Sequence, residues 1–355
     1  MTKLLEIEEY IDDLRYISQL PLPYEKMKGS SIMVSGATGM IGSFLIDSIM
    51  YMNRESNLGC HIYALGRTRQ KAQSRFVSYF GDSDFTFIEC DLNDSKCQDV
   101  FPQTVDYIFH AASNTHPVAY SKYPIETITT NVIGTNNLLS YACAAGCRRF
   151  VFASSNEIYG ENRGDTELFD EQYCGYINSN TLRAGYPESK RCGEALCQAY
   201  MSQKGLDIVI PRFTRTYGPT MLMSDTKAIS QFIKKALAGE DIVLKSEGNQ
   251  YYSYTYAGDA VSGLLTVLLL GETGEAYNIS HISSDIRLRD LAQLIASQAG
   301  KKVVFELPDE VERRGYSTAT KARLDGTKIS TLGWSPRYSC ISGITKTLDV
   351  LKEVL

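Results

Sequence analysis

The sequence predicts an α/β protein in which a doubly wound parallel sheet is followed by a smaller C-terminal α/β lobe. Between residues 31 and 213, six runs rich in β-branched and aromatic residues alternate with helical segments, as in a parallel sheet with helical crossovers. The first run ends in glycines at GxxGxxG spacing, directly before a helical segment. The chain of 355 residues is long enough for one large domain or two lobes.

An extra helix is expected in the N-terminal extension, residues 1–30. The segment LLEIEEYIDDLRYI, residues 4–17, carries apolar residues at close to helical spacing. Two prolines and a glycine in the following QLPLPYEKMKG end the pattern. We expect this helix to cover an edge of the fold or to join two subunits.

The sheet is expected to occupy residues 31–213. Its predicted strands are SIMVSG (31–36), CHIYALG (60–66), FTFIEC (85–90), YIFHAAS (107–113), RRFVFAS (148–154) and LDIVIPRF (206–213). Predicted helices between them include residues 41–54, 131–146 and 187–205. This is the size of a Rossmann-like domain that binds a dinucleotide.

Shorter, mixed elements are expected in residues 214–355, which we predict to form a smaller substrate-binding lobe, partly interleaved with the sheet domain. Helices are predicted at residues 227–240, 258–271 and 288–301, and strands at 241–245, 275–280 and 302–308. A lobe set against the open end of a sheet forms a cleft for a ligand.

Composition excludes several classes of protein. The 36 basic and 41 acidic residues give a net charge of -5 without a basic run, so nucleic-acid binding is not expected. The longest apolar stretch, GLLTVLLLG, is far shorter than the ~20 residues that span a bilayer, so no membrane association is expected. Nine cysteines, mostly within apolar patterns, indicate the reduced thiols of a cytoplasmic protein. Cys143 and Cys147 lack a second pair of ligands, so no metal site is expected.

The glycine motif VSGATGMIGSFL lies between the first strand and its helix. Glycines allow a sharp turn and a close approach to a pyrophosphate, whose charge suits a helix N-terminus. We therefore predict a dinucleotide cofactor held by Gly36, Thr38, Gly39, Met40, Ile41 and Gly42.

The ends of later strands should complete the cofactor site. Arg67 follows the second strand, where NAD sites usually carry an acid, so NADP is favoured over NAD. Alternatively, Arg67 and Arg69 are both solvated, or one stacks on the adenine. Further cofactor contacts are expected from Asp91, Leu92, Ala111, Ala112, Ser113 and Arg212.

A catalytic group is expected where GYPESKRCGEAL places Tyr186 and Lys190 four residues apart on one helix face. The lysine should lower the pKa of the phenol toward the range of a general base, and both residues should also contact the cofactor. The strand end SSNEIYG adds Ser155. We expect Ser155 and Tyr186 to hold one substrate hydroxyl while a hydride leaves for the nicotinamide.

Together these motifs resemble the extended short-chain dehydrogenase/reductases that modify nucleotide-activated sugars. The similarity extends from about residue 31 to 350 and rests on GATGMIG, CDLND, HAAS, NVIGTNNLL, SSNEIYG, YPESK, RTYGPTM, SYTYAGDAV and LGWSP. The resemblance implies that Ser155, Tyr186 and Lys190 are catalytic and that the C-terminal lobe holds the nucleotide. It also implies a homodimer formed by the helices that follow the fourth and fifth strands.

The residues after Ser155 leave the reaction open. In the family, a glutamate at the position of Glu157 is typical of sugar 4,6-dehydratases, where it removes the C5 proton, and of UDP-glucuronate decarboxylases, whereas epimerases often lack it. Asn156 cannot donate a proton as the aspartate of dehydratases does. Two alternatives remain: an NADPH-dependent reductase that makes a nucleotide-linked alcohol, and a non-catalytic NADP-binding scaffold.

Two departures from the family pattern concern the substrate. RFTRTYGPTM has Arg215 where many relatives have Asn, and GNQYYSYTYAGD has Tyr252 where relatives usually have Arg. Both positions commonly touch the substrate pyrophosphate in the family, so Arg215 and Tyr252 are predicted substrate contacts, together with Ser155. One cation is gained and one is lost, which favours phosphate binding with a different geometry.

Overall fold

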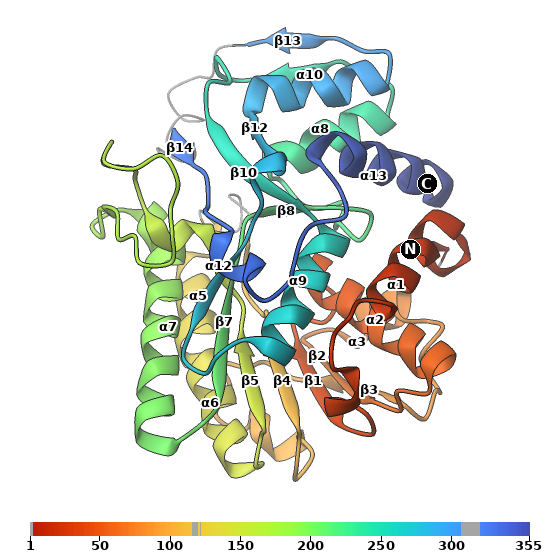
Figure 1. The fold of residues 1–355 in the computed structure, drawn as a ribbon, viewed down its shortest axis with the longest axis vertical. Helices are drawn as coiled ribbons and strands as arrows, with labels where there is room; N and C mark the ends of the chain where they lie inside the picture. The colour runs from red at the N-terminus through yellow and green to blue at the C-terminus, as the bar shows by residue number, and fades with distance from the viewer. Residues whose placement is uncertain (1–2, 116–119, 121, 307–319) are drawn as a thin grey trace.

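The computed structural model describes residues 3–115, 120, 122–306 and 320–355. A large parallel sheet forms its lower part in Figure 1. All six predicted strands are present: β1 (Ser31–Ser35), β2 (His61–Gly66), β3 (Phe85–Glu89), β4 (Tyr107–His110), β5 (Arg149–Phe152) and β7 (Ile208–Phe213). The strand order β11-β7-β5-β4-β1-β2-β3 reverses its direction of growth between β1 and β4, where ligands of such sheets bind.

Helices cover both faces of this sheet (Figure 1). They are α2 (Met40–Ser56), α3 (Arg69–Arg75), α5 (Pro124–Thr129), α6 (Thr135–Ala144), α7 (Gly185–Lys204) and α9 (Ala257–Leu270). The helix predicted over residues 131–146 is longer than expected, because α5 continues into α6 through the π-helical turn η4 (Thr130–Gly134). Short 3-10 turns include η3 (Cys97–Val100), η5 (Asn156–Tyr159) and η6 (Leu182–Ala184).

The second lobe, at the top of Figure 1, is built around β10 (Tyr251–Tyr256). β10 runs antiparallel to β12 (Asp285–Arg287) and parallel to β8 (Arg215–Tyr217) and β14 (Lys321–Ala322). The other elements are α8 (Ala228–Leu237), β9 (Ile242–Leu244), η7 (Ile282–Ser284), α10 (Leu288–Gln298), β13 (Val303–Phe305), α12 (Thr327–Ser330) and α13 (Cys340–Val354). Each element predicted here has a counterpart, although the last two residues of the strand predicted at 302–308 lie outside the described residues.

The two parts of the chain are interleaved. The strand predicted at residues 275–280 is β11 (Ala276–Ile279), which pairs with β7 and so extends the large sheet. The helix α9 precedes it and packs against both α2 and β7. Every described strand of the large sheet other than β11 lies before residue 214.

The N-terminal extension forms η1 (Leu4–Glu6), α1 (Glu8–Ser18) and η2 (Tyr24–Lys26). The helix α1 packs against α2, α9 and α13, so it joins the sheet domain to the C-terminal helix rather than covering a sheet edge. Its Tyr10 hydroxyl donates a hydrogen bond to Asp47 of α2 at 2.6 Å. Its Asp13 accepts hydrogen bonds from Tyr256 and Tyr338, each at 2.7 Å. Among the described helices, none has the length and apolar character needed to cross a bilayer.

Candidate active site

The glycine loop between β1 and α2 is constrained by its close contacts. Gly36 has φ +69°, and a Cβ there would lie 2.8 Å from the backbone of Ala111 and Ala112. A Cβ on Gly42 would lie 2.5 Å from the carbonyl oxygen of Gly36. Gly39 caps α2, and its N–H donates to the same carbonyl at 2.9 Å. The loop therefore brings the N-terminus of a 17-residue helix to the ends of β1 and β4, as a pyrophosphate site requires.

A cavity of 1450 Å³ extends from this loop across the carboxyl ends of the strands into the second lobe. Its volume exceeds the range of about 300–1,000 Å³ that is usual for one small ligand, so the cavity has room for more than one. The predicted site residues that line it are Gly36, Thr38, Gly39, Met40, Ile41, Gly42, Arg67, Asp91, Leu92, Ala111, Ala112, Ser113, Ser155, Asn156, Glu157, Tyr186, Lys190, Arg215 and Tyr252. No group of three or more His, Cys, Asp or Glu able to hold a metal occurs in the described parts of the chain.

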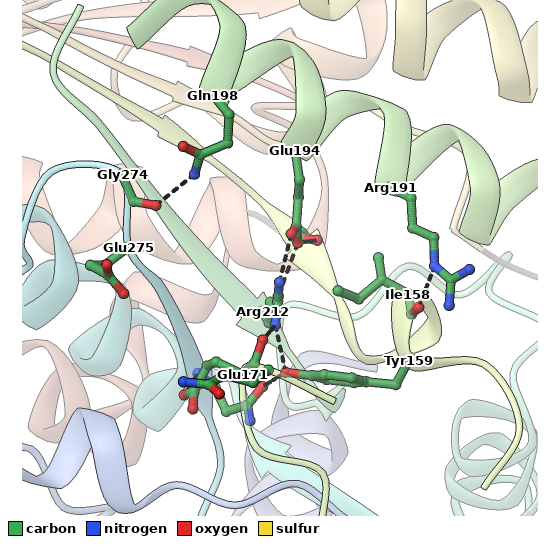
Figure 2. A network of polar contacts seen from close by, with 12 residues as sticks. Ile158, Tyr159, Glu171, Arg191, Glu194, Gln198, Arg212, Gly274 and Glu275 are labelled. Atoms are coloured by element: carbon green, nitrogen blue, oxygen red, sulfur yellow. Dashed lines mark hydrogen bonds and ion pairs between the residues drawn. The ribbon is translucent and has the colours of Figure 1, made fainter. Parts of the chain in front are cut away.

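Arg212 is the one predicted site residue that does not line the cavity, so its predicted contact with the cofactor is not found. Figure 2 shows its side chain against Glu194 of α7. The guanidinium donates to both carboxylate oxygens of Glu194, at 3.0 and 2.7 Å. It also donates to the Tyr159 hydroxyl at 2.9 Å and to the Glu171 carbonyl at 2.6 Å. These partners occupy the guanidinium of Arg212 outside the cavity lining.

The predicted catalytic residues come together at the end of β5 and the start of α7. Ser155 begins the turn η5, and its Oγ accepts a hydrogen bond from the Glu157 N–H at 3.3 Å. Lys190 Nζ donates to the Ala153 carbonyl at 2.7 Å. Tyr186 lies against Tyr120, with ring centroids 4.8 Å apart.

The expected effect of Lys190 on Tyr186 is not found. Burial raises the pKa of Tyr186 above its ordinary value, and the hydrogen bond with Ser155 opposes this only in part. Burial also lowers the pKa of Lys190, to about 8. The lysine is bound to the Ala153 carbonyl and the phenol is enclosed by Tyr120, so desolvation outweighs any attraction between the two groups.

Sequence reasoning missed Arg183, three residues before Tyr186. Its Nη2 donates to both carboxylate oxygens of Glu157 at 2.6 Å. Its guanidinium lies over the Tyr120 ring, 5.0 Å from the centroid. Its Nε and Nη1 are buried and have no hydrogen-bond partner among the described residues. The i, i+3 spacing to Tyr186 on the helical turn leading into α7 is the signal that could have placed it at the site.

A second set of residues that the sequence did not reveal, Ser35, His110 and Thr135, supports the end of β4. The Ser35 hydroxyl is hydrogen-bonded to His110 Nδ1 at 2.7 Å and accepts the N–H groups of Ala111 and Ala112. His110 Nε2 is hydrogen-bonded to Thr135 at 2.9 Å. Burial lowers the pKa of His110 to about 3, so this imidazole is neutral and serves to position the loop that faces Gly36.

The end of the cavity beside α3 is cationic. Arg67 lines it together with Gln70, Lys71 and Ser74 of α3. Arg69 does not line the cavity: it lies over the Phe87 ring and near Glu89, at 3.9 Å. The two arginines of this segment therefore have different environments.

The opposite end of the cavity belongs to the second lobe. Pairing of β8 with β10 brings Arg215 beside Tyr252, with the guanidinium carbon 3.5 Å from the ring centroid. Arg215 Nη1 is buried without a hydrogen-bond partner among the described residues. Lys227, Lys235 and Lys245 also line this end. These cations suit an anionic ligand such as a diphosphate.

Comparisons with known proteins agree with this geometry. A sequence model described as the NAD dependent epimerase/dehydratase family matches residues 32–280. UDP-glucuronic acid decarboxylase 1 of Xenopus tropicalis is 31% identical over 336 residues, covering 91% of this chain and 72% of that protein. UDP-glucuronic acid decarboxylase 5 of Arabidopsis thaliana is 32% identical over 317 residues, covering 88% and 86%.

Among solved structures, a dTDP-glucose 4,6-dehydratase of Streptomyces venezuelae with NAD and TYD bound superposes with a TM-score of 0.79 at 25% identity. The match covers 91% of this chain and 97% of that one. A UDP-glucuronic acid 4-epimerase of Bacillus cereus, in complex with UDP-glucuronic acid and NAD, has a TM-score of 0.76 at 23% identity and covers 92% and 100%. The second likeness shows the fold alone.

Proposed function

The chain belongs to the NAD dependent epimerase/dehydratase family, and we propose that it decarboxylates a nucleotide-linked uronate to a nucleotide-linked pentose. In this proposal the sugar is oxidised at C4, loses its carboxyl group as CO2 and regains the hydride. No cofactor is consumed. The relatives named above as UDP-glucuronic acid decarboxylases support this choice within the family.

The observation that carries the proposal is the group formed by Asn156, Glu157 and Arg183. A dehydratase must protonate the hydroxyl that leaves C6, but the side-chain amide of Asn156 is not acidic enough to transfer a proton. A β-keto acid loses CO2 without an acid on the leaving group and needs only a proton returned to C5. Glu157 can relay that proton, and Arg183 places a cation beside it.

Each residue of the site has its own part in the proposed reaction. The bound nicotinamide supplies the acceptor, and later the donor, of the hydride. Ser155 and Tyr186 hold the C4 hydroxyl, and Tyr186 takes its proton as a phenolate. Burial alone disfavours that phenolate, and the positive charge of the oxidised nicotinamide would favour it. When the C5–C6 bond breaks, its electron pair moves to the C4 oxygen, which both hydroxyls then stabilise as an enolate. C5 takes up one proton by way of Glu157, so the overall change is uronate plus a proton to pentose plus CO2.

Arg183 is the group that distinguishes a uronate from a neutral hexose in this proposal. Two of its nitrogens are buried without partners, which is costly unless a ligand satisfies them. A carboxylate is the acceptor that best matches a guanidinium. After CO2 leaves, Arg183 keeps Glu157 as its partner.

The test is incubation of the purified protein with UDP-glucuronate, UDP-glucose and dTDP-glucose, followed by proton NMR of the products. Only UDP-glucuronate should react, giving a UDP-pentose and CO2 with no net change in nicotinamide absorbance. Arg183→Met should lower kcat/KM for UDP-glucuronate by about 10- to 100-fold, the effect of losing about 1.5–3 kcal/mol from a charged hydrogen bond. Arg163→Met, an exposed arginine outside the cavity lining, should match the unmodified protein.

Other outcomes would reject the proposal in distinct ways. A 4-keto-6-deoxy product from dTDP-glucose would identify a dehydratase. Stoichiometric loss of NADPH absorbance with a keto sugar would identify a reductase. Cofactor binding without turnover of any nucleotide sugar would leave only a scaffold.

We also propose that the preferred cofactor is NADP, that the protein is a homodimer and that it is cytoplasmic. The cationic lining at Arg67 and Lys71 supports a 2′-phosphate. Exposed Ile125, Ile133 and Leu182, on or next to the helices that flank α7, support a subunit contact there. All nine cysteines are free thiols, as in a reducing compartment.

A further inference from the structure

The face of α7 that carries the catalytic residues continues one turn beyond them. Tyr186, Lys190 and Glu194 follow at four-residue intervals and therefore lie on one side of the helix. The first two line the cavity, whereas Glu194 does not. Figure 2 shows the Glu194 side chain directed from α7 toward Arg212.

Three segments of the chain meet at the Glu194 carboxylate. Oε1 accepts hydrogen bonds from the Ser154 hydroxyl at 2.5 Å and from Arg212 Nε at 3.0 Å, and Oε2 accepts from Arg212 Nη2 at 2.7 Å. Ser154 and Arg212 are cross-strand neighbours in the pairing of β6 (Ser154–Ser155) with β7. The side chains of Glu194 and Arg212 are only 14% and 10% exposed, so this is a desolvated ion pair.

These contacts hold the strand end that carries Ser155. Ser154 and Ser155 are consecutive in β6, so their side chains leave the strand in opposite directions. A fixed Ser154 therefore also fixes the direction of Ser155. A second hydrogen bond to α7 is made by Ala153, the residue before Ser154: its carbonyl accepts from Lys190 Nζ at 2.7 Å.

Arg212 is itself held from the other side. It donates to the Tyr159 hydroxyl and to the Glu171 carbonyl, and Tyr159 in turn donates to Asn278 of β11 at 2.6 Å. Arg212, which binds Glu194, is thus connected through Tyr159 to β11, the edge strand of the large sheet.

We propose that Glu194 is a positioning residue, which holds Ser155 against Tyr186 through Ser154 and helps to keep Lys190 charged. The role rests on the hydride-transfer chemistry of the proposed function, but not on decarboxylation. Arg212 serves as the clamp that keeps the Glu194 carboxylate in place.

The charges around Lys190 support the second half of this role. Burial lowers the pKa of Lys190 to about 8, while Cys197 and Glu194 of the same helix act to raise it. His110 of β4 is a neutral imidazole, since burial, and after it the charge of Lys190, lowers its pKa to about 3. The Phe152 ring of β5 lies under the ammonium at 4.8 Å. Burial raises the pKa of the Cys197 thiol, so that group stays neutral, and Glu194 is the anionic one of the two that favours the charged form of Lys190.

The test is Glu194→Gln, compared with the unmodified protein over a range of pH with UDP-glucuronate. We expect kcat to fall by about 10- to 100-fold while KM changes less than about twofold. The alkaline limb of the kcat profile should move to lower pH by about one unit, because Lys190 loses a neighbouring negative charge. Arg212→Lys should retain more activity than Arg212→Met, since a lysine preserves the charge of the clamp.

Gln198→Ala is the matched control. Gln198 lies one turn further along α7 than Glu194 and donates a hydrogen bond to the Gly274 carbonyl at 2.7 Å (Figure 2). It therefore binds α7 to another segment without a hydrogen bond to Ser154. Its variant should keep the kcat and the pH profile of the unmodified protein. Equal losses in the Gln198 and Glu194 variants, or an unchanged Glu194→Gln enzyme, would overturn the proposal.

Two further measurements keep the test decisive. If Glu194→Gln does not fold, Ser154→Ala removes only one hydrogen bond, and it should lower kcat severalfold at constant KM; an unchanged kcat would count against positioning. If UDP-glucuronate is not a substrate, the affinity for NADH, followed by fluorescence, should decline above about pH 8 and at lower pH in Glu194→Gln. The same pH dependence in both proteins would reject the role of Glu194 even though decarboxylation had failed separately.

Discussion

Arg67 lines the cavity at the end beside α3, and its charge bears on the proposed preference for NADP. We expect Arg67→Ala to weaken NADPH binding by about 10- to 100-fold, because one charged hydrogen bond to the 2′-phosphate is worth about 1.5–3 kcal/mol. Binding of NADH should change little. Titrations followed by nicotinamide fluorescence measure both affinities.

Arg69→Ala supplies the control for this cofactor prediction, because Arg69 lies over Phe87 outside the cavity lining. It should leave both affinities unchanged. Tighter binding of NADH than NADPH by the unmodified protein, unaffected by Arg67→Ala, would mean that Arg67 is merely solvated.

Individual residues also show how far sequence reasoning reaches. The glycine loop and the Tyr186–Lys190 pair were predictable because each is a local motif whose spacing has a physical reason. The contact of Arg183 with Glu157 was not predictable, since the two residues are 26 positions apart and only the fold brings them together. Arg212 was predicted wrongly because its position near a strand end suggests a side chain that lines the cavity. In the fold its guanidinium instead binds Glu194 of α7.

At the scale of elements, α1 is expected to contribute strongly to stability. Leu14 is fully buried between α1 and the rest of the core, so Leu14→Ala should lower the free energy of unfolding by about 2–5 kcal/mol. Urea denaturation followed by circular dichroism measures this change. Glu9→Ala, at an exposed position of the same helix, should cost less than about 0.5 kcal/mol. Equal stability of both variants would show that α1 is a loosely attached appendage.

The strands differ in how readily they can be predicted from the sequence. Strands of the large sheet are covered by helices on both faces, and this burial produces the continuous apolar runs that predicted them. β10 reads YYSYTY and was missed, because its buried polar groups are satisfied by partners elsewhere. Ser253 donates to Asp285 at 2.5 Å and Thr255 accepts from Thr214 at 2.6 Å. Hydrophobic periodicity cannot reveal a strand of this kind.

For the whole molecule, the predicted homodimer can be tested at the exposed isoleucines of the α5–α6 segment. Ile125 and Ile133 are 72% and 45% exposed. The double change Ile125→Glu and Ile133→Glu should convert a dimer to a monomer in sedimentation velocity, because two charges would be buried at the contact. Ile282→Glu, at an isoleucine of η7 that is 63% exposed, should leave the dimer intact. A monomeric unmodified protein would contradict the prediction.

The return of the chain through β11 has a consequence for engineering this enzyme. A change of the bound sugar or base could be attempted by exchanging residues 214–355 for those of a relative. This exchange would remove β11 from the large sheet and α9 from its face, along with the second lobe. A fragment that stops at residue 213 would leave β7 as an open edge, able to pair with other chains and aggregate. A graft should therefore leave β11 and α9 in place and replace the stretches on either side of them separately.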